Sequence, residues 1–281
     1  MTAPQSFRLA GVIGWPVAQS RSPALHGHWL SQYGVSGAYL PLPVQPERLA
    51  DAIRGLRALG FSGCNVTIPH KRAVLNLLDQ VDPVAARIGA VNTVVVQDNG
   101  ALSGFNTDAY GFLASLRDVR EDFKASAGPI VILGAGGAAR AVVVSLLDDG
   151  AREIRVANRT LERAQELSRI DSSRIRVIDW GERNAALDGA ALLVNTTSQG
   201  MVDYPPLDLV LDALPRTAVV SDIVYNPLET PLLAAARRRG NTVVDGLGML
   251  LHQAVPAFEA FYGLRPRVSN ELRRAVEATL A

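Results

Sequence analysis

Short apolar runs alternate with longer segments in which apolar residues recur at helical spacing, and this alternation continues along most of the chain. Short runs bounded by turn residues predict strands, whereas the longer amphipathic segments predict helices. The expected strands are 9–13, 38–42, 64–68, 91–96, 101–104, 130–133, 154–157, 175–178, 192–195, 219–223 and 242–244, and the expected helices are 23–32, 46–59, 108–117, 249–261 and 268–279. Strands that alternate with helices are typical of an α/β fold with mostly parallel strands.

One pair of the expected strands is predicted to run antiparallel. Asp98-Asn99-Gly100 separates the apolar runs 91–96 and 101–104, and Asn-Gly favours the tight turn of a hairpin. The first third of the chain is therefore expected to form a mixed sheet.

The apolar run 130–133 leads into a glycine-rich turn and a helical segment, with the pattern G-x-G-x-x-A. Glycines permit the tight turn and let main-chain N–H groups approach a pyrophosphate, whose charge the N-terminus of a helix stabilises. We therefore predict a Rossmann-type dinucleotide-binding domain, in which the residues next to the cofactor are Gly134, Gly136, Gly137 and Ala138.

The residues after the next strand indicate which dinucleotide is bound. An NAD site usually carries Asp or Glu there, which binds the ribose 2′-hydroxyl. This chain has Asn158-Arg159-Thr160, with Arg163 one helical turn further on. Two guanidinium groups and a hydroxyl suit a 2′-phosphate, so the predicted cofactor is NADP. Alternatively, Arg159 and Arg163 are spaced i, i+4 because they form a solvated helix face.

The position of the glycine motif predicts the order of the domains. Because the motif follows a complete α/β unit, we expect a substrate-binding α/β domain over 1–106 and a Rossmann-type NADP-binding domain over 107–248. The C-terminal helices, within 249–281, are expected to pack back on the first domain. The active site is expected in the interdomain cleft, at the carboxyl ends of the strands.

Composition narrows the class of protein. The chain has 281 residues, 48% of them hydrophobic, and a net charge of +1, without a basic stripe or a long apolar span. We therefore expect no nucleic-acid or membrane partner. The protein is expected to be a monomer or homodimer. Residues 1–6 lack the pattern of a signal peptide, and the single cysteine, Cys64, is expected to be buried in a strand. Both features favour a cytoplasmic protein.

Four polar clusters interrupt the apolar pattern of the first domain and the start of the second. Their hydroxyls and amides suit a small hydroxylated or carboxylated ligand. Reduction of a carbonyl requires a hydride on carbon and a proton on oxygen, so Lys71 is a candidate proton donor and Asp108 a candidate partner that holds it. The clusters are Ser20-Arg-Ser22-Pro23, Asn65-Val-Thr67-Ile-Pro69-His-Lys71, Ala90-Val-Asn92-Thr93 and Gly104-Phe-Asn106-Thr107-Asp108.

Each candidate also has a purely structural interpretation. Ser20 and Ser22 are alternatively turn and N-cap residues before Pro23 at the first helical turn. The pair Thr107-Asp108 is alternatively an N-cap pair for the following helix. Lys71 is alternatively a surface lysine at the head of a helix, and Asn92 a partner for a buried main-chain group. The four histidines are expected to be surface or packing residues, because no pair has metal-ligand spacing and no metal site is predicted.

Taken together, the motifs resemble those of the shikimate dehydrogenase family along nearly the whole chain. Besides the clusters above, the matching motifs are Gly134-Ala-Gly136-Gly137-Ala, Asn158-Arg159-Thr160-x-x-Arg163, Asn195-Thr-Thr-Ser198-x-Gly200-Met201, Asp222-Ile-Val-Tyr225-Asn-Pro227-x-x-Thr230-Pro231-Leu232 and Gly246-x-Gly248-Met249-Leu250-x-x-Gln253-Ala. The resemblance implies NADPH-dependent reduction of 3-dehydroshikimate to shikimate, a step of chorismate and aromatic amino-acid biosynthesis.

The resemblance also implies a role for each matching residue. Lys71 and Asp108 match the catalytic pair, and Ser20 and Ser22 match the residues that hold the substrate carboxylate. Further matches to substrate-binding positions are Thr67, Asn92, Tyr225 and Gln253. Asn158, Arg159, Thr160 and Arg163 match the 2′-phosphate site, while Gly246 and Met249 match positions near the cofactor.

Three other functions remain open from the sequence. One is a quinate/shikimate dehydrogenase that uses NAD, which Arg159 and Arg163 disfavour. Another is a reductase of an aminated shikimate analogue. The third is a non-catalytic NADP-binding sensor, which the presence of both Lys71 and Asp108 disfavours.

Overall fold

The computed structural model describes residues 7–280, so the expectation for residues 1–6 lies outside the described residues. The chain divides into two compact units. Unit 1 comprises Met1–Thr107 and Gln253–Ala281, and unit 2 comprises Asp108–His252. The expectation that the first part binds substrate and the second binds NADP stays a prediction.

Unit 1 is built on a six-stranded sheet with the order β2-β1-β3-β5-β6-β4. β1 is parallel to β2 and β3, whereas β5 is antiparallel to both β3 and β6, so the predicted mixed sheet and the hairpin at 98–100 are confirmed. The strands are β1 (Arg8–Gly14), β2 (Gly37–Pro43), β3 (Phe61–Val66), β4 (Gln80–Val81), β5 (Thr93–Val96) and β6 (Leu102–Phe105).

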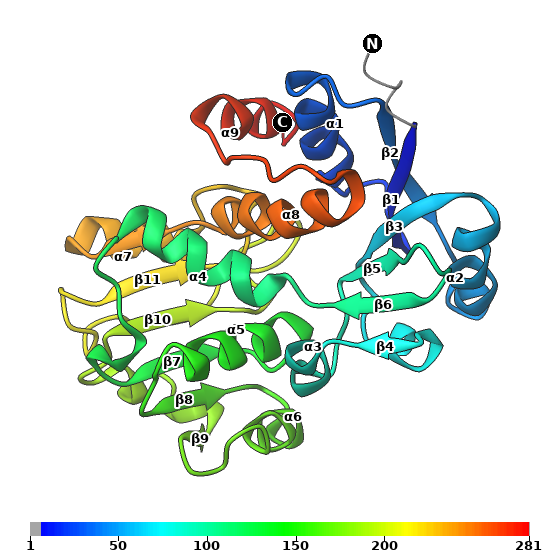
Figure 1. Ribbon diagram of the computed structural model, residues 1–281. Helices are drawn as coiled ribbons and strands as arrows, with labels where there is room; N and C mark the ends of the chain where they lie inside the picture. Colours follow the sequence, from blue (N-terminus) through cyan, green and yellow to red (C-terminus); the bar gives the residue numbers. More distant parts are fainter. Residues whose placement is uncertain (1–6, 281) are drawn as a thin grey trace. The chain divides into compact units, whose positions relative to one another are not determined.

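Helix α2 packs on the strands of this sheet, whereas helix α1 lies beside helix α9. Leu49, Ile53 and Leu56 of α2 pack with apolar residues of β1, β3 and β5. Elsewhere in unit 1, α1 and α9 lie side by side, and the indole N–H of Trp29 donates to Arg267 O at 3.1 Å (Figure 1). The elements are α1 (Ser22–Gln32), α2 (Leu49–Ala58), α3 (Pro83–Ile88), α9 (Asn270–Glu277), the 3-10 turns η1 (Pro46–Arg48) and η2 (Ala73–Leu77), and the part of α8 (Gly246–Tyr262) that follows His252.

Unit 2 contains a six-stranded sheet in which every pair of neighbours is parallel. Its order is β12-β11-β10-β7-β8-β9, which is the strand order of doubly wound dinucleotide-binding folds (Figure 1). The strands are β7 (Ile130–Leu133), β8 (Ile154–Ala157), β9 (Ile175–Ile178), β10 (Leu192–Asn195), β11 (Val219–Asp222) and β12 (Thr242–Val244). The predicted Rossmann-type fold is therefore confirmed.

Successive residues of each strand in unit 2 face opposite sides of the sheet, so both sides need cover. Ile130 and Ile132 pack with residues of α4, α5 and α6, whereas Val131 and Leu133 pack with residues of α7. The helical elements are α4 (Asp108–Val119), α5 (Gly137–Asp148), α6 (Leu161–Ser168), α7 (Pro231–Arg239) and the 3-10 turns η3 (Ala125–Ala127), η4 (Trp180–Glu182) and η5 (Ala185–Leu187).

Several expected elements differ from the observed ones. The helix predicted at 46–59 begins as the 3-10 turn η1, a common form of a first helical turn. The strand predicted at 64–68 begins at Phe61 and ends at Val66. Gly63 lies inside β3, where a Cβ would clash with Val94 O. The pattern also did not identify β4, α3, α6 and α7, of which all but α7 have eight residues or fewer.

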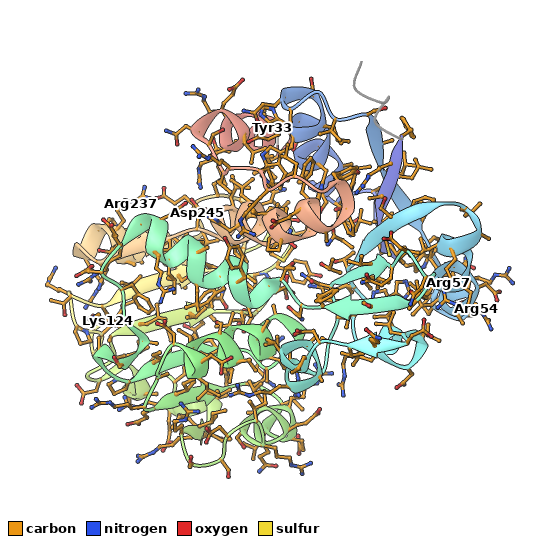
Figure 2. All side chains as sticks on the ribbon, in the orientation of Figure 1. Tyr33, Arg54, Arg57, Lys124, Arg237 and Asp245 are labelled. Atoms are coloured by element: carbon orange, nitrogen blue, oxygen red, sulfur yellow. The ribbon has the colours of Figure 1, made fainter. Side chains whose placement is uncertain are left out.

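Charged side chains on the surface of unit 1 form ion pairs. Arg54 and Arg57 project outward from α2 in Figure 2. Arg54 pairs with Asp51 at 3.1 Å, and Arg57 pairs with Asp79. Because both pairs are well exposed, each contributes at most about 1 kcal/mol to stability.

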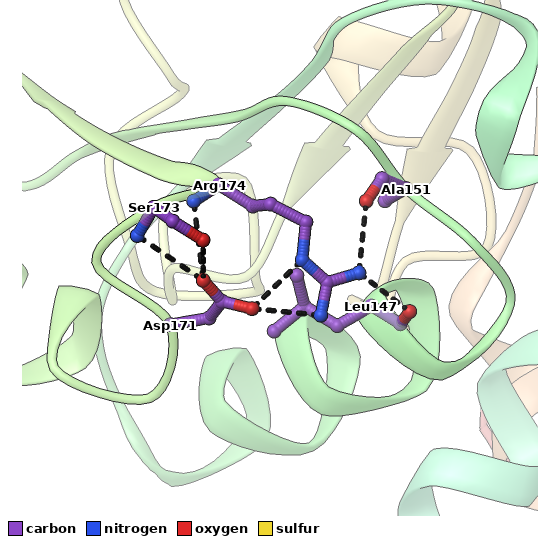
Figure 3. Close-up of polar contacts among 5 residues, drawn as sticks. All are labelled: Leu147, Ala151, Asp171, Ser173 and Arg174. Carbon is purple, nitrogen blue, oxygen red and sulfur yellow. Dashed lines mark hydrogen bonds and ion pairs between the residues drawn. The ribbon is translucent and has the colours of Figure 1, made fainter.

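A more enclosed ion pair holds the loop between α6 and β9 in unit 2. The carboxylate of Asp171 accepts hydrogen bonds from Ser173 and Arg174, and the Arg174 guanidinium also donates to Leu147 O and Ala151 O beyond α5 (Figure 3). Hydrogen bonds from Ser173 and Arg174 lower the pKa of Asp171 to about 2. This loop is therefore fastened to the C-terminal end of α5.

Candidate active site

Three polar residues from distant parts of the sequence meet in unit 1. Asn92 precedes β5, Thr107 follows β6 and Gln253 lies in α8. Asn92 Nδ2 donates to Thr107 Oγ1 at 3.0 Å and to Gln253 Oε1 at 3.4 Å. The structure thus brings together Asn92 and Gln253, two predicted substrate-binding residues that are 161 positions apart.

Asn92 also has the structural role that the sequence left open. Its side-chain oxygen accepts the main-chain N–H of Thr107 at 2.8 Å, so Asn92 does satisfy a buried main-chain group. This bond occupies the oxygen of the amide, whereas the nitrogen faces Thr107 Oγ1 and Gln253. The two roles therefore use different atoms of one side chain.

Ser20 and Ser22 do not cap helix α1. The N-cap residue is Arg21, and its side chain makes no capping hydrogen bond. Ser20 Oγ instead accepts the main-chain N–H of Ser22 at 3.3 Å, so the two residues are neighbours within one turn. The turn role that the sequence left open is therefore confirmed for Ser20, whereas the N-cap role is wrong because Arg21 is the N-cap residue. The carboxylate-binding role stays a prediction.

Thr67 and Lys71 lie on a tight turn that three hydrogen bonds hold in place, two from its main chain and one from the side chain of His70. Thr67 N–H donates to Ile13 O at 2.9 Å, and Lys71 O accepts the N–H of Val91, directly before Asn92, at 2.8 Å. His70 Nε2 lies 2.7 Å from Val44 O and, since a carbonyl only accepts, carries the hydrogen of this bond. Lys71 itself is half-buried in the turn before η2 rather than at the head of an α-helix.

Asp108 is the first residue of α4 and of unit 2, and it is 6% exposed. It directly follows Thr107, whose N–H is bonded to Asn92. The predicted substrate-binding cluster of unit 1 and the predicted catalytic carboxylate are therefore adjacent in the chain.

The glycine-rich turn of unit 2 fits a dinucleotide. A Cβ at Gly134, whose φ is +105°, would lie 2.5 Å from Thr196 Oγ1, so the tight turn requires glycine. At Gly136 and Gly137 a Cβ would meet nothing within 4 Å, which leaves open space at the N-terminus of α5. Main-chain N–H groups facing open space at a helix N-terminus suit a pyrophosphate.

The residues after β8 are available for the adenosine end of such a cofactor. Arg159, Thr160 and Arg163 are exposed, and Asn158 Nδ2 donates to Thr160 O at 2.7 Å, which holds the turn before α6. Exposure alone also agrees with a solvated helix face. The 2′-phosphate role therefore stays a prediction.

Asp222 is a buried residue to which the sequence analysis assigned no role. Its carboxylate accepts hydrogen bonds from Asn195 Nδ2 at 3.0 Å, Thr230 Oγ1 at 2.8 Å and Val224 N at 3.1 Å. Burial raises the pKa of Asp222, and these hydrogen bonds oppose that shift. The signal was present in the sequence, since Asn195 and Asp222 are polar residues at the carboxyl ends of two apolar strands.

The loop after β11 carries Tyr225 and leads to Gly246. At Gly246 a Cβ would clash with Ile223 O, so only glycine allows this close approach of two main-chain segments. Met249 is 9% exposed and belongs to the apolar core of unit 2. Contacts of Tyr225, Gly246 and Met249 with ligands stay predictions.

The histidines have packing or surface roles in the described part of the chain. His26 is buried among aromatic rings, His70 binds Val44 O, and His252 Nε2 lies 2.6 Å from Asp118. Among residues 7–280, no group of three His, Cys, Asp or Glu side chains is arranged to hold a metal ion. Cys64 is buried as expected, and burial raises the pKa of its thiol.

None of the helices within residues 7–280 is both long enough and apolar enough to cross a membrane.

Two family profiles match the chain. The profile described as the shikimate dehydrogenase substrate binding domain matches residues 12–94, and that described as shikimate / quinate 5-dehydrogenase matches residues 118–202. The shikimate dehydrogenase (NADP(+)) of Paramagnetospirillum magneticum is 59% identical over 269 residues, which cover 96% of this chain and 98% of that relative.

Solved structures match as well. The shikimate 5-dehydrogenase of Thermus thermophilus in complex with NADP(H) and shikimate is 38% identical, with a TM-score of 0.84 over 97% of this chain and 98% of that one. The quinate dehydrogenase of Corynebacterium glutamicum in complex with NAD is 34% identical, with a TM-score of 0.89 over 96% of this chain and 99% of that one.

Proposed function

The chain belongs to the shikimate dehydrogenase family, and from this premise we propose that it catalyses the NADPH-dependent, reversible reduction of 3-dehydroshikimate to shikimate. The observation that carries the proposal is the cluster of Asn92, Thr107 and Gln253. These side chains come from three distant segments and meet within hydrogen-bonding distance next to the turn that holds Lys71. Such convergent polar groups are typical of a small-molecule site.

Lys71 and Asp108 carry the acid–base chemistry in this proposal. NADPH supplies a hydride when it is bound. Lys71 Nζ donates the proton that the ketone oxygen needs as negative charge develops on it, and the Asp108 carboxylate holds the ammonium in place. In the reverse direction the same amine accepts the hydroxyl proton.

The other predicted residues orient the substrate. Ser20 and Ser22 donate to its carboxylate, because hydroxyl groups on one turn suit two carboxylate oxygens. Thr67, Asn92, Tyr225 and Gln253 bind the ring hydroxyls or the carboxylate. Their placement fixes which ring carbon is presented for reduction.

The NADP site in this proposal lies at the N-terminus of α5 and the turn after β8. Gly134, Gly136, Gly137 and Ala138 leave room for the pyrophosphate, which the open space above Gly136 and Gly137 supports. Arg159 and Arg163, with Asn158 and Thr160, bind the 2′-phosphate, while Gly246 and Met249 lie near the nicotinamide.

The proposal is tested by the absorbance of reduced nicotinamide with the purified protein. Shikimate and quinate are each offered with NADP and with NAD. We expect rapid reduction of NADP with shikimate and slow or no reaction in the other three mixtures.

Two outcomes would contradict the proposal. Turnover of quinate with NAD would make the chain a quinate/shikimate dehydrogenase. Binding of NADP without turnover in any mixture would indicate a sensor, or a reductase of an aminated analogue.

We also propose that the enzyme is located in the cytoplasm and that it is a monomer or homodimer. A single buried thiol suits a reducing compartment. Sedimentation of the purified protein determines the oligomeric state.

A further inference from the structure

We propose that Tyr39 is a positioning residue of the substrate site, which acts through Asn65 and Thr93 to hold the Asn92 amide in place. The inference rests on the proposed function, in which Asn92 binds the substrate. Tyr39 itself belongs to β2 and is buried. It was not among the residues that the motifs indicated.

Hydrogen bonds connect Tyr39 to Asn92, and the first residue between them is Asn65. Asn65 Nδ2 lies 3.1 Å from Asn92 O and 3.0 Å from Thr93 Oγ1. Because a main-chain carbonyl only accepts, the nitrogen of Asn65 must face it. The oxygen of Asn65 then faces Tyr39, whose hydroxyl donates to it at 2.7 Å.

Thr93 connects Asn65 to the side chain of Asn92. Thr93 Oγ1 accepts from Asn65, so its own proton is available to Asn92 Oδ1, 2.9 Å away. The main-chain N–H of Thr107 donates to the same oxygen at 2.8 Å. A main-chain N–H only donates, so the oxygen and nitrogen of the Asn92 amide cannot be exchanged without leaving a buried donor unsatisfied.

The orientation of the Asn92 amide determines which kind of ligand atom it can bind. Its oxygen accepts from Thr93 Oγ1 and from the main-chain N–H of Thr107, and Thr107 Oγ1 also lies 3.3 Å from it. The Nδ2 edge faces Thr107 Oγ1 and Gln253 Oε1. A ligand atom that binds the Nδ2 edge, in place of the long 3.4 Å bond to Gln253 Oε1, must therefore accept a hydrogen bond. A ketone or hydroxyl oxygen can do so, whereas a protonated amine has no lone pair to offer. This polarity favours an oxygen substituent over the aminated analogue that the sequence left open.

The surroundings of Tyr39 hold its hydroxyl in this position. The ring stacks on the His26 imidazole with centroids 3.9 Å apart and planes inclined by 8°. Burial lowers the pKa of His26 to about 3, so this neighbour is neutral and apolar in character at neutral pH. Burial raises the pKa of Tyr39, and a side-chain hydrogen bond with Ser22, a predicted substrate-binding residue, opposes that shift.

The test uses Tyr39→Phe, with Tyr262→Phe as the matched control. Tyr262 lies in the same aromatic cluster, and its hydroxyl donates to Ala38 O at 2.9 Å without joining the chain to Asn92. Tyr39→Phe removes the hydroxyl that contacts Asn65 and Ser22, and Tyr262→Phe removes the hydroxyl that binds Ala38 O. Tyr39→Phe should raise the KM for shikimate about tenfold, the effect of roughly one hydrogen bond, and leave the KM for NADP unchanged. Tyr262→Phe should leave both constants unchanged.

A double-mutant cycle separates positioning from general loss of structure. If Tyr39 acts through Asn92, adding Tyr39→Phe to Asn92→Ala should change the KM for shikimate less than twofold, because the effects of coupled residues are not additive. A full tenfold further loss would overturn the inference. So would Tyr39→Phe behaving like Tyr262→Phe, although the proposed function would stand. An unchanged KM in Asn92→Ala would overturn both.

The polarity of Asn92 has its own test in competitive inhibition. The probes are shikimate and three analogues, each with an ammonium in place of one ring hydroxyl. At least one analogue should bind the enzyme ten times or more weakly than shikimate, and Asn92→Asp, which replaces the donor by an acceptor, should reduce that ratio. Equal binding of shikimate and all three analogues would contradict the assigned direction of the amide.

Discussion

The hydroxyl of Thr230 connects the buried carboxylate of Asp222 to the start of helix α7. Its Oγ1 donates to Asp222 Oδ2 at 2.8 Å and accepts the main-chain N–H of Leu233 at 3.3 Å. One oxygen thus binds a buried carboxyl group and caps a helix. Since Asp222 also holds Asn195 and Val224, this bond ties together the loops that follow β10 and β11.

Replacing this hydroxyl should destabilise unit 2. Thr230→Val keeps the shape of the side chain but leaves Asp222 Oδ2 and Leu233 N–H without this partner, at a cost of about 2 kcal/mol. Thr230→Ser, the control, retains the hydroxyl and should lose much less. Thermal unfolding of the two variants measures the difference. Equal midpoints would show that the hydroxyl contributes nothing.

The Asp171 carboxylate should make stability depend on acid pH. Its hydrogen bonds to Ser173 and Arg174 lower the pKa to about 2 in the folded protein, below the value of about 4 in an unfolded chain. Its contribution is therefore fully present above about pH 4 and is lost as the pH falls towards 2. Wild type should exceed Asp171→Asn in melting temperature at neutral pH, and the gap should narrow as the pH falls from about 4 to 2. A gap that widens in acid would contradict the shift.

Loss of one predicted phosphate-binding arginine should change cofactor preference. Arg159→Ala should lower kcat/KM for NADP by about ten- to a hundredfold, since a charge-assisted hydrogen bond contributes about 1.5–3 kcal/mol, while activity with NAD stays nearly constant. Arg169→Ala removes the same charge from the exposed C-terminal end of α6 and serves as the control. Equal losses with both cofactors would reject the 2′-phosphate assignment.

Removal of the proposed proton donor should affect kcat more than KM. Lys71→Ala should lower kcat by about 10²–10⁴-fold, the usual effect of losing an acid–base group. Arg72→Ala, at the neighbouring exposed position, controls for a general loss of positive charge and should retain normal turnover. Steady-state kinetics with shikimate and NADP measure both. A Lys71→Ala variant within roughly threefold of wild type would exclude Lys71 as the donor.

The central strands of unit 2 were predictable because their chemistry is local. β7 and β10, which are buried along their whole length, begin and end where the apolar runs 130–133 and 192–195 predicted. Strands buried on both faces are continuous apolar runs between polar turns. The glycine-rich turn could also be predicted from the sequence, because the tight turn at Gly134 has no room for a side chain.

Elements that depend on distant partners were not predictable from local pattern. β4 has only two residues and exists because it pairs with β6. In the site, the sequence identified Asn92 and Gln253 separately but gave no sign that their side chains touch.

The sequence by itself thus determined the two sheets, the glycine turn and the kinds of side chain at the candidate site. Only the tertiary structure decided that Tyr39 faces Asn65, that Thr107 N–H occupies the Asn92 oxygen, and that Asp222 meets Thr230. The physical reason is that apolar periodicity and turn chemistry act between near neighbours, whereas the direction of a buried hydrogen bond is set by which donors and acceptors folding places within about 3 Å of each other.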